Sequence, residues 1–232
     1  HGAEEVLWND AAIRPAQCTR TIRVGEGEAE TEWTKSYTDA LGRTFLIVQA
    51  DGASSRSYYN DLGKLWKSVD PDGVTTLYAY NAKGEQEYSA VDIDQDDEID
   101  FAGPDRISRS QSGVTQRGAV TVRRSTSSVW TDTGEQVVSI QDSAVGGGTA
   151  TDESWSESFG RVSHTATVID AENRTRTTTS TAPDGTYTVT VYQDGQLAST
   201  ATYATDATLL REVYYGYDAH GRQTQVTETT GD

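Results

Sequence analysis

Hydrophobic and polar residues alternate along much of the chain. In residues 186–192, the side chains of Tyr187, Val189 and Val191 would point to one side of an extended strand and the threonines to the other. Residues 174–182 are almost entirely threonine, arginine and serine, which suits a strand with at least one face in water. No stretch of a dozen residues shows the 3.6-residue period of an amphipathic helix. The pattern therefore predicts an all-β protein with little helix.

Turn signals separate these strand-like segments at intervals of about 10 to 12 residues. Many contain Asp-Gly, which provides the positive φ of tight hairpin turns at little steric cost. A block of 21 residues also repeats, because Gly42, Gly63 and Gly84 are 21 residues apart. Such a repeat indicates that one hairpin unit is copied and packs against its neighbours. We therefore expect consecutive antiparallel hairpins over residues 37–92. Their turns are expected near Gly42, Gly52, Gly63, Gly73 and Gly84.

An aromatic residue stands four positions before several of the turn glycines, namely Tyr59, Tyr80, Trp130 and Tyr217. This spacing predicts that each ring is buried and stacks on its counterpart one repeat away, since cross-strand aromatic pairs stabilise sheets. The alternative is that the rings are exposed and stack on a ligand.

Charge and composition narrow the functional classes. The 232 residues carry a net charge of −17, which argues against nucleic acid or an anionic membrane surface as a partner. No run approaches the roughly 18 apolar residues of a membrane span, so membrane insertion is not expected. The single cysteine, Cys18, excludes an intramolecular disulfide framework.

The motif Tyr217-Asp218-Ala219-His220-Gly221-Arg222 resembles the Rhs/YD-repeat family, as do weaker copies at residues 60–64 and 81–85 and the intervening segment 70–80. The clear resemblance covers residues 36–92 and 212–226. It implies a fragment of a bacterial YD-repeat protein, in which an antiparallel hairpin meander curves or spirals as a partial shell or solenoid. Such shells enclose cargo domains in bacterial toxins, and animal relatives contribute to cell-surface adhesion. Residues 1–34 are then an initial segment or a degenerate repeat, and residues 35–232 form the repeat domain.

An acidic segment interrupts the repeat at residues 92–105. Carboxylates occupy positions 1, 3, 5 and 9 of this segment, as at the start of an EF-hand calcium loop. In the 21-residue register the segment replaces a hairpin turn, so a return strand should begin at residues 106–108. Calcium is the expected ion; the alternative is a solvated acidic loop without one. The candidate ligands are Asp92, Asp94, Asp96, Glu98, Asp100 and Asp105.

Three functions remain open. The first is a structural segment of a secreted or cell-surface YD-repeat protein that builds a shell, stalk or fibre, and whose partners are further repeats or neighbouring copies. The second is a carbohydrate-binding or adhesin module that uses aromatics such as Trp33, Trp66, Trp130 or Trp155. The third, a polysaccharide-active enzyme, is the least favoured, because no Ser-centred, Cys/His or zinc-binding motif is present. The sequence favours the structural role, with no catalytic residue.

Overall fold

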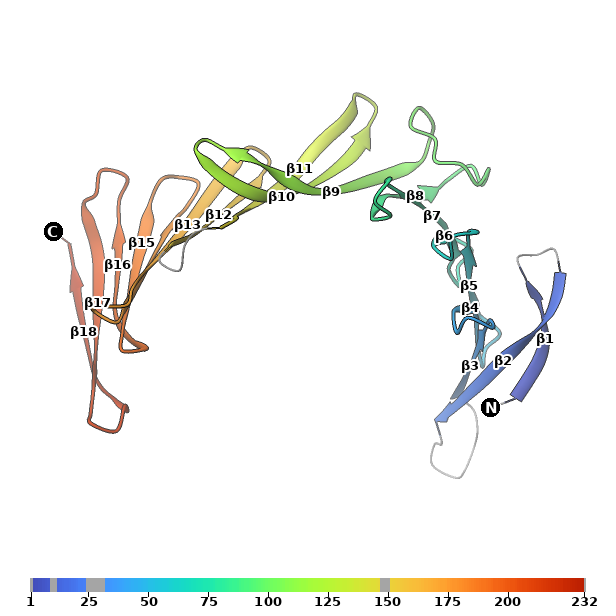
Figure 1. Cartoon of the computed structure of the whole chain (residues 1–232), viewed down its shortest axis with the longest axis horizontal. Coiled ribbons are helices and arrows are strands. Elements are labelled where there is room, and N and C mark those ends of the chain that lie inside the picture. The colour runs from blue at the N-terminus through green and yellow to red at the C-terminus, as the bar shows by residue number, and fades with distance from the viewer. Residues whose placement is uncertain (1, 9–11, 24–31, 147–150, 232) are drawn as a thin grey trace. The chain divides into compact units, whose positions relative to one another are not determined.

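The computed structural model describes residues 2–8, 12–23, 32–146 and 151–231. Within these ranges the secondary structure consists of 18 strands and no helix, which confirms the all-β prediction (Figure 1). The described residues therefore contain no helix long and apolar enough to cross a membrane. The chain divides into two compact units, one of residues 1–109 and 129–134 and the other of residues 110–128 and 135–232.

The first nine strands are β1 (Gly2–Trp8), β2 (Ala12–Arg23), β3 (Glu32–Thr38), β4 (Thr44–Gln49), β5 (Ser54–Tyr59), β6 (Leu65–Val69), β7 (Thr75–Tyr80), β8 (Gln86–Asp92) and β9 (Arg106–Arg117). The other nine are β10 (Val120–Thr131), β11 (Gly134–Ala144), β12 (Thr151–Ser158), β13 (Arg161–Asp170), β14 (Thr175–Thr181), β15 (Tyr187–Gln193), β16 (Gln196–Tyr203), β17 (Leu209–Tyr217) and β18 (Gln223–Thr230). The predicted initial segment, residues 1–34, contributes β1, β2 and the start of β3; its residues 1, 9–11 and 24–31 lie outside the described ranges.

Consecutive hairpins build the first unit. Each strand from β3 to β8 pairs antiparallel with the next one along the chain. The five predicted turn glycines all have positive φ, between +76° and +89°, and each lies between two paired strands. The predicted hairpins and their turns are therefore confirmed. At the repeating turns the strand pairing shifts by one residue, for example between Tyr58 and Tyr59 and between Ala79 and Tyr80.

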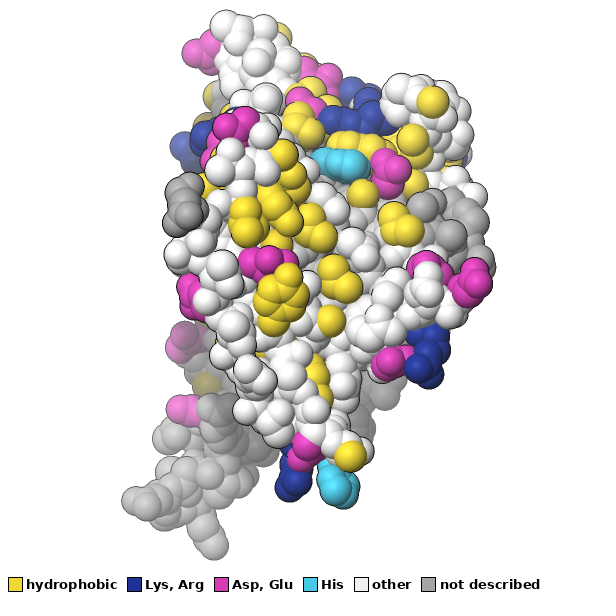
Figure 2. Space-filling view, turned by 90° about the vertical axis from the view of Figure 1, so that its left-hand side faces the viewer, with side chains coloured by type: hydrophobic (Ala, Val, Ile, Leu, Met, Phe, Trp, Pro, Cys, Tyr) yellow, Lys and Arg dark blue, Asp and Glu magenta, His cyan; other side chains and the backbone are white. Residues whose placement is uncertain are grey.

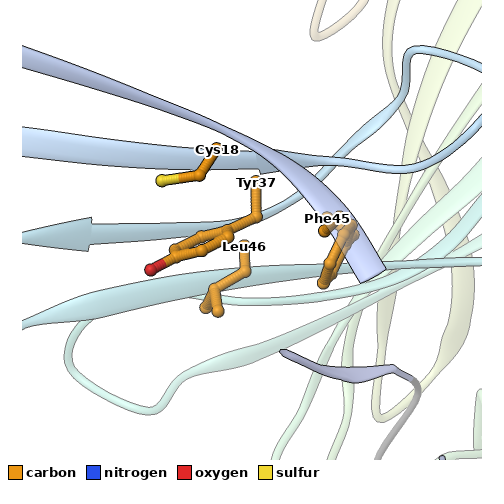
Figure 3. Close-up of a cluster of buried hydrophobic side chains, with 5 residues drawn as sticks. Cys18, Tyr37, Phe45 and Leu46 are labelled. Carbon is orange, nitrogen blue, oxygen red and sulfur yellow. The ribbon is translucent and has the colours of Figure 1, made fainter. Parts of the chain in front are cut away.

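The buried core of the first unit is small. Its main cluster consists of Ala16 and Cys18 from β2, Tyr37 from β3, and Phe45 and Leu46 from β4 (Figure 3). Tyr58, Leu77, Ala90 and Ile107 are also buried. The strand register places Cys18 opposite Tyr37 and Tyr37 opposite Leu46, which brings these side chains onto one face. Cys18 is a buried free thiol and therefore serves as a small apolar residue.

The second unit is a sheet whose two faces differ in chemistry. From β12 to β18 each strand pairs antiparallel with the next. One face carries hydroxyl pairs in register, whose oxygens lie 3.1 to 3.4 Å apart: Thr165 with Ser180, Thr167 with Thr178, and Thr188 with Thr202. The other face carries Tyr187, Val189 and Val191, as the alternation predicts. Figure 2 shows hydrophobic side chains gathered across the surface of this unit.

Candidate functional site

The repeating turns are closed by one acidic or amide side chain each. In the turn after β7, the Asn81 side-chain oxygen accepts hydrogen bonds from the backbone N–H groups of Lys83 at 2.9 Å and Glu85 at 3.0 Å. Asp39, Asn60, Asp70 and Asp218 make the same pair of bonds two and four residues ahead. These bonds explain why the motif requires aspartate or asparagine immediately after its aromatic residue, since only a short side chain reaches these N–H groups.

The tyrosine of each motif binds the preceding repeat. The Tyr59 hydroxyl donates to the Thr44 carbonyl at 2.8 Å, and the Tyr80 hydroxyl donates to the Leu65 carbonyl at 2.6 Å. In the C-terminal copy, the Tyr217 hydroxyl donates to the Leu197 carbonyl at 3.0 Å. A tyrosine is required here because phenylalanine would leave the carbonyl without this donor.

A basic residue of the preceding repeat covers the rings of Tyr59 and Tyr80. The Arg43 guanidinium lies 4.6 Å from the ring centre of Tyr59, and the Lys64 ammonium lies 4.7 Å from that of Tyr80. Lys64 Nζ also donates to the Gly84 carbonyl at 2.5 Å. We call this set of contacts the repeat clamp: the tyrosine hydroxyl on a carbonyl one repeat back, and that repeat's cation on the ring. The rings of Tyr59 and Tyr80 therefore each meet a cation and not, as predicted from the spacing, the tyrosine one repeat away.

Trp130 makes a different contact from the repeat tyrosines. Its ring lies edge-on to those of Tyr88 and Phe101, with centroids 5.9 and 5.0 Å apart. Tyr88 and Phe101 also meet edge-on, at 5.3 Å. Phe101 belongs to the acidic segment, so this aromatic trio anchors the segment to β8 and β10.

Two buried carboxylates organise the acidic segment. Asp92 and Asp105 are only 4% and 8% exposed. The Asp92 carboxylate accepts hydrogen bonds from the backbone N–H groups of Gln95 at 2.7 Å and Asp97 at 3.2 Å. The Asp105 carboxylate accepts hydrogen bonds from the backbone N–H groups of Ile93 and Asp100, both at 3.0 Å. Strand β9 begins at Arg106, so the predicted return strand is confirmed. Two of the candidate ligands therefore already stabilise the loop through backbone hydrogen bonds.

Three of the six candidate calcium ligands converge. Oxygens of Asp92, Asp94 and Asp96 all lie within 4.8 Å of one another. The pKa of Asp94 is raised, first by desolvation and then by the neighbouring Asp96 carboxylate, so a cation at this position would relieve a local repulsion. Glu98, Asp100 and Asp105 are outside this group.

The second unit contains a charged cluster that the sequence did not reveal. The Asp142 side chain is fully buried, and it accepts hydrogen bonds from Arg117 Nη1 at 2.8 Å and from Arg124 Nε and Nη2 at 2.7 Å. Hydrogen bonds from Arg124 and then Arg117 hold the pKa of Asp142 below its usual value, although burial opposes this shift. The Arg117 guanidinium lies 5.4 Å from the ring centre of Trp155. The three residues come from different strands, so only their register in the sheet brings them together.

Comparisons with known proteins give structural matches alone. No protein-family model matches the chain, and no curated protein matches its sequence. Among solved structures, it is similar to a chain of the crystal structure of TcdB2-TccC3-TEV, with 12% identity and a TM-score of 0.29. It is also similar to a chain of the Photorhabdus luminescens Tc holotoxin pore carrying the TccC3 D651A mutation, with 14% identity and a TM-score of 0.27. Each match covers 98% of this chain but only 15% of the solved chain, and at these values neither identifies a family.

Proposed function

We propose that this chain is a non-catalytic, structural segment of a secreted or cell-surface YD-repeat protein, in which hairpins add one after another to a shell, stalk or fibre. The observation that carries the proposal is the repeat clamp. Each clamp joins one hairpin unit to the preceding one through Tyr59 and Arg43, or through Tyr80 and Lys64. Stability that is shared between neighbouring repeats suits an extendable scaffold.

The proposed partners are further repeats, in a longer chain or a neighbouring copy, and β18 is the strand that would receive them. All eight residues of β18 are exposed, whereas the preceding strands β13 to β17 contain half-buried and buried positions. An exposed strand of this length presents backbone N–H and C=O groups to which another strand can pair.

Sedimentation of the chain over a range of concentrations tests this proposal. We expect self-association that Val226→Lys in β18 weakens, because a lysine opposes pairing at a strand edge. Ile169→Lys is the matched control: Ile169 is 47% exposed, close to the 53% of Val226, but lies in β13 between two paired strands. A strictly monomeric chain at high concentration, or equal effects of the two substitutions, would contradict the proposal.

We also propose that calcium binds the acidic segment through Asp92, Asp94 and Asp96, with Glu98, Asp100 and Asp105 as further candidate ligands. Support comes from the convergence of the first three carboxylates and the raised pKa of Asp94. Carboxylate oxygens are the ligands that calcium prefers. The ion would fix the loop between β8 and β9.

Melting temperature with calcium and with a chelator tests the calcium proposal. Bound calcium should stabilise the fold by about 2.7 kcal/mol when its free concentration is 100 times the Kd. Asp94→Asn should remove the difference between the two conditions and should not lower the melting temperature in chelator, because it relieves repulsion. Asp61→Asn, in an exposed turn outside the segment, should leave the calcium effect intact. Identical melting curves with calcium and with chelator would contradict the proposal.

A further inference from the structure

A row of side chains in direct register crosses five strands of the second unit. Trp155 in β12 pairs with His164 in β13, which pairs with Thr181 in β14. Thr181 pairs with Tyr187 in β15, which pairs with Tyr203 in β16. Residues opposite one another in a sheet share a face, so these five side chains form one line, here called the aromatic row.

The rings of the aromatic row are stacked in two parallel pairs. The Trp155 and His164 rings have centroids 4.7 Å apart and planes 13° apart. The Tyr187 and Tyr203 rings have centroids 4.9 Å apart and planes 15° apart. By contrast, the described ring pairs of the first unit meet edge-on, at 60° to 81°. Within each pair the two rings are therefore nearly parallel and come from adjacent strands, one strand spacing apart.

Thr181 is the one small side chain in the row, and it separates the two pairs. His164 has Trp155 against one of its faces and Tyr187 has Tyr203 against one of its own, so their remaining faces are directed to the position of Thr181. Two strand spacings correspond to about 9.6 Å. A ring placed over Thr181 would lie about 4.8 Å from each neighbour, which is the centroid spacing already found within the pairs.

Polar atoms along this row have no hydrogen-bond partner in the described part of the chain. This holds for the hydroxyls of Thr181, Tyr187 and Tyr203. His164 Nε2 also lacks a hydrogen bond, although it lies 3.4 Å from a Glu153 carboxylate oxygen. Tyr59, Tyr80 and Tyr217 differ, because each of their hydroxyls donates to a backbone carbonyl. The row thus combines aromatic rings with hydroxyl groups that no described protein group occupies, a combination suited to a ligand with both apolar and hydroxyl surfaces.

Charge at the row disfavours an anionic ligand. Asp142 forms ion pairs with Arg117 and Arg124, the cations at the Trp155 end of the row, and a second carboxylate, that of Glu157, is close enough to raise the pKa of Arg124. Glu153 is the charged side chain beside His164. A phosphate or an acidic sugar would therefore find no uncompensated cation here, whereas a neutral ring would need none.

We propose that the aromatic row binds a neutral glycan, with one pyranose ring over Thr181 between His164 and Tyr187. The C–H faces of the sugar ring contact the two aromatic faces, and its hydroxyls bond with those of Thr181 and Tyr187. The neighbouring sugars extend along the aromatic face of the sheet, over side chains such as Val189. This binding role is independent of the scaffold role proposed above.

Titration with neutral hexasaccharides of glucose (β-1,4 and α-1,4), xylose and N-acetylglucosamine tests this proposal, with calorimetry as the readout. We expect at least one to bind the full chain. Thr181→Phe fills the space between the rings and should weaken binding at least tenfold. Ser180→Phe adds the same ring to the same strand on the opposite face and should leave binding unchanged.

Tyr187→Phe provides a second variant if Thr181→Phe fails to fold. It keeps the ring face and removes a hydroxyl that makes no bond within the described protein, so circular dichroism and melting should not change while glycan binding weakens several-fold. Absence of binding by all four hexasaccharides at millimolar concentration would overturn the proposal. Equal losses with Thr181→Phe and Ser180→Phe, or binding of free phenol or indole without any glycan, would also overturn it.

Discussion

Removing Tyr80 tests whether the repeat clamp holds neighbouring hairpins together. The hydroxyl bond to the Leu65 carbonyl is 2.6 Å long, and a neutral hydrogen bond contributes about 1 kcal/mol net. Truncating a fully buried aromatic ring to alanine costs about 3–5 kcal/mol, and about half of that applies here because Tyr80 is half-buried. Tyr80→Ala should therefore lower the free energy of unfolding by about 3 kcal/mol, and Tyr80→Phe by about 1 kcal/mol.

Urea unfolding followed by tryptophan fluorescence measures these losses, since four of the five tryptophans, Trp8, Trp33, Trp66 and Trp130, belong to the first unit. A double-mutant cycle of Lys64→Met and Tyr80→Phe or Ala separates the cation contact from the hydroxyl bond. We expect a coupling energy of about 0.5–1 kcal/mol between Lys64→Met and Tyr80→Ala, because Tyr80→Ala removes the ring that Lys64 contacts. Lys64→Met and Tyr80→Phe should show no coupling, because Tyr80→Phe keeps the ring.

The matched control for the hydroxyl is Tyr187→Phe, which removes a hydroxyl without a partner among the described residues. It should change the free energy of unfolding by less than about 0.3 kcal/mol, because no protein hydrogen bond is lost. The clamp would be refuted if Tyr80→Phe were as mild as this control, or if Lys64 showed no coupling to the Tyr80 ring.

Two further predictions follow from other contacts. Gly84→Ala should destabilise the fold more than Gly73→Ala, although both glycines have positive φ. A Cβ on Gly84 would collide with the Lys64 ammonium, whereas one on Gly73 meets no atom within 4 Å. Equal losses in urea unfolding would argue against the Lys64 contact. Asp142→Asn should cost about 3 kcal/mol, since it breaks a buried ion pair whose cations reach solvent. Because the folded pKa of Asp142 is lowered, its contribution is present at neutral pH and is lost as the pH falls below about 4 and through the folded pKa. The variant should accordingly show a flatter dependence of stability on pH in this range than the parent chain.

The acidic segment shows how far sequence reasoning reached at a candidate site. Its position between two strands and the start of β9 at Arg106 followed from the repeat register and are confirmed. The sequence suggested six candidate ligands, of which the structure groups Asp92, Asp94 and Asp96. Asp105 is instead directed to backbone N–H groups of the segment. Sequence spacing could not reveal this, because the path of an irregular loop is set by which N–H groups need an acceptor.

The sequence by itself determined the features that depend on interactions over a few residues. The strands follow from two-residue alternation, and the turns follow from glycines with positive φ and from side chains such as Asn81, which bonds two and four residues ahead. These interactions are local, so they are the same in any arrangement of the hairpins.

Tertiary structure alone decided which side chains meet across strands. Lys64 donates a hydrogen bond to the Gly84 carbonyl, 20 residues away in the sequence. Asp142 accepts hydrogen bonds from two arginines that are 18 and 25 residues away. Thr181 lies between His164 and Tyr187 because the register of three strands places it there. Alternation fixes only the face on which a residue lies; its neighbours on that face depend on turn lengths and on the register shifts that bulges introduce, and a shift of one residue moves every side chain to the opposite face.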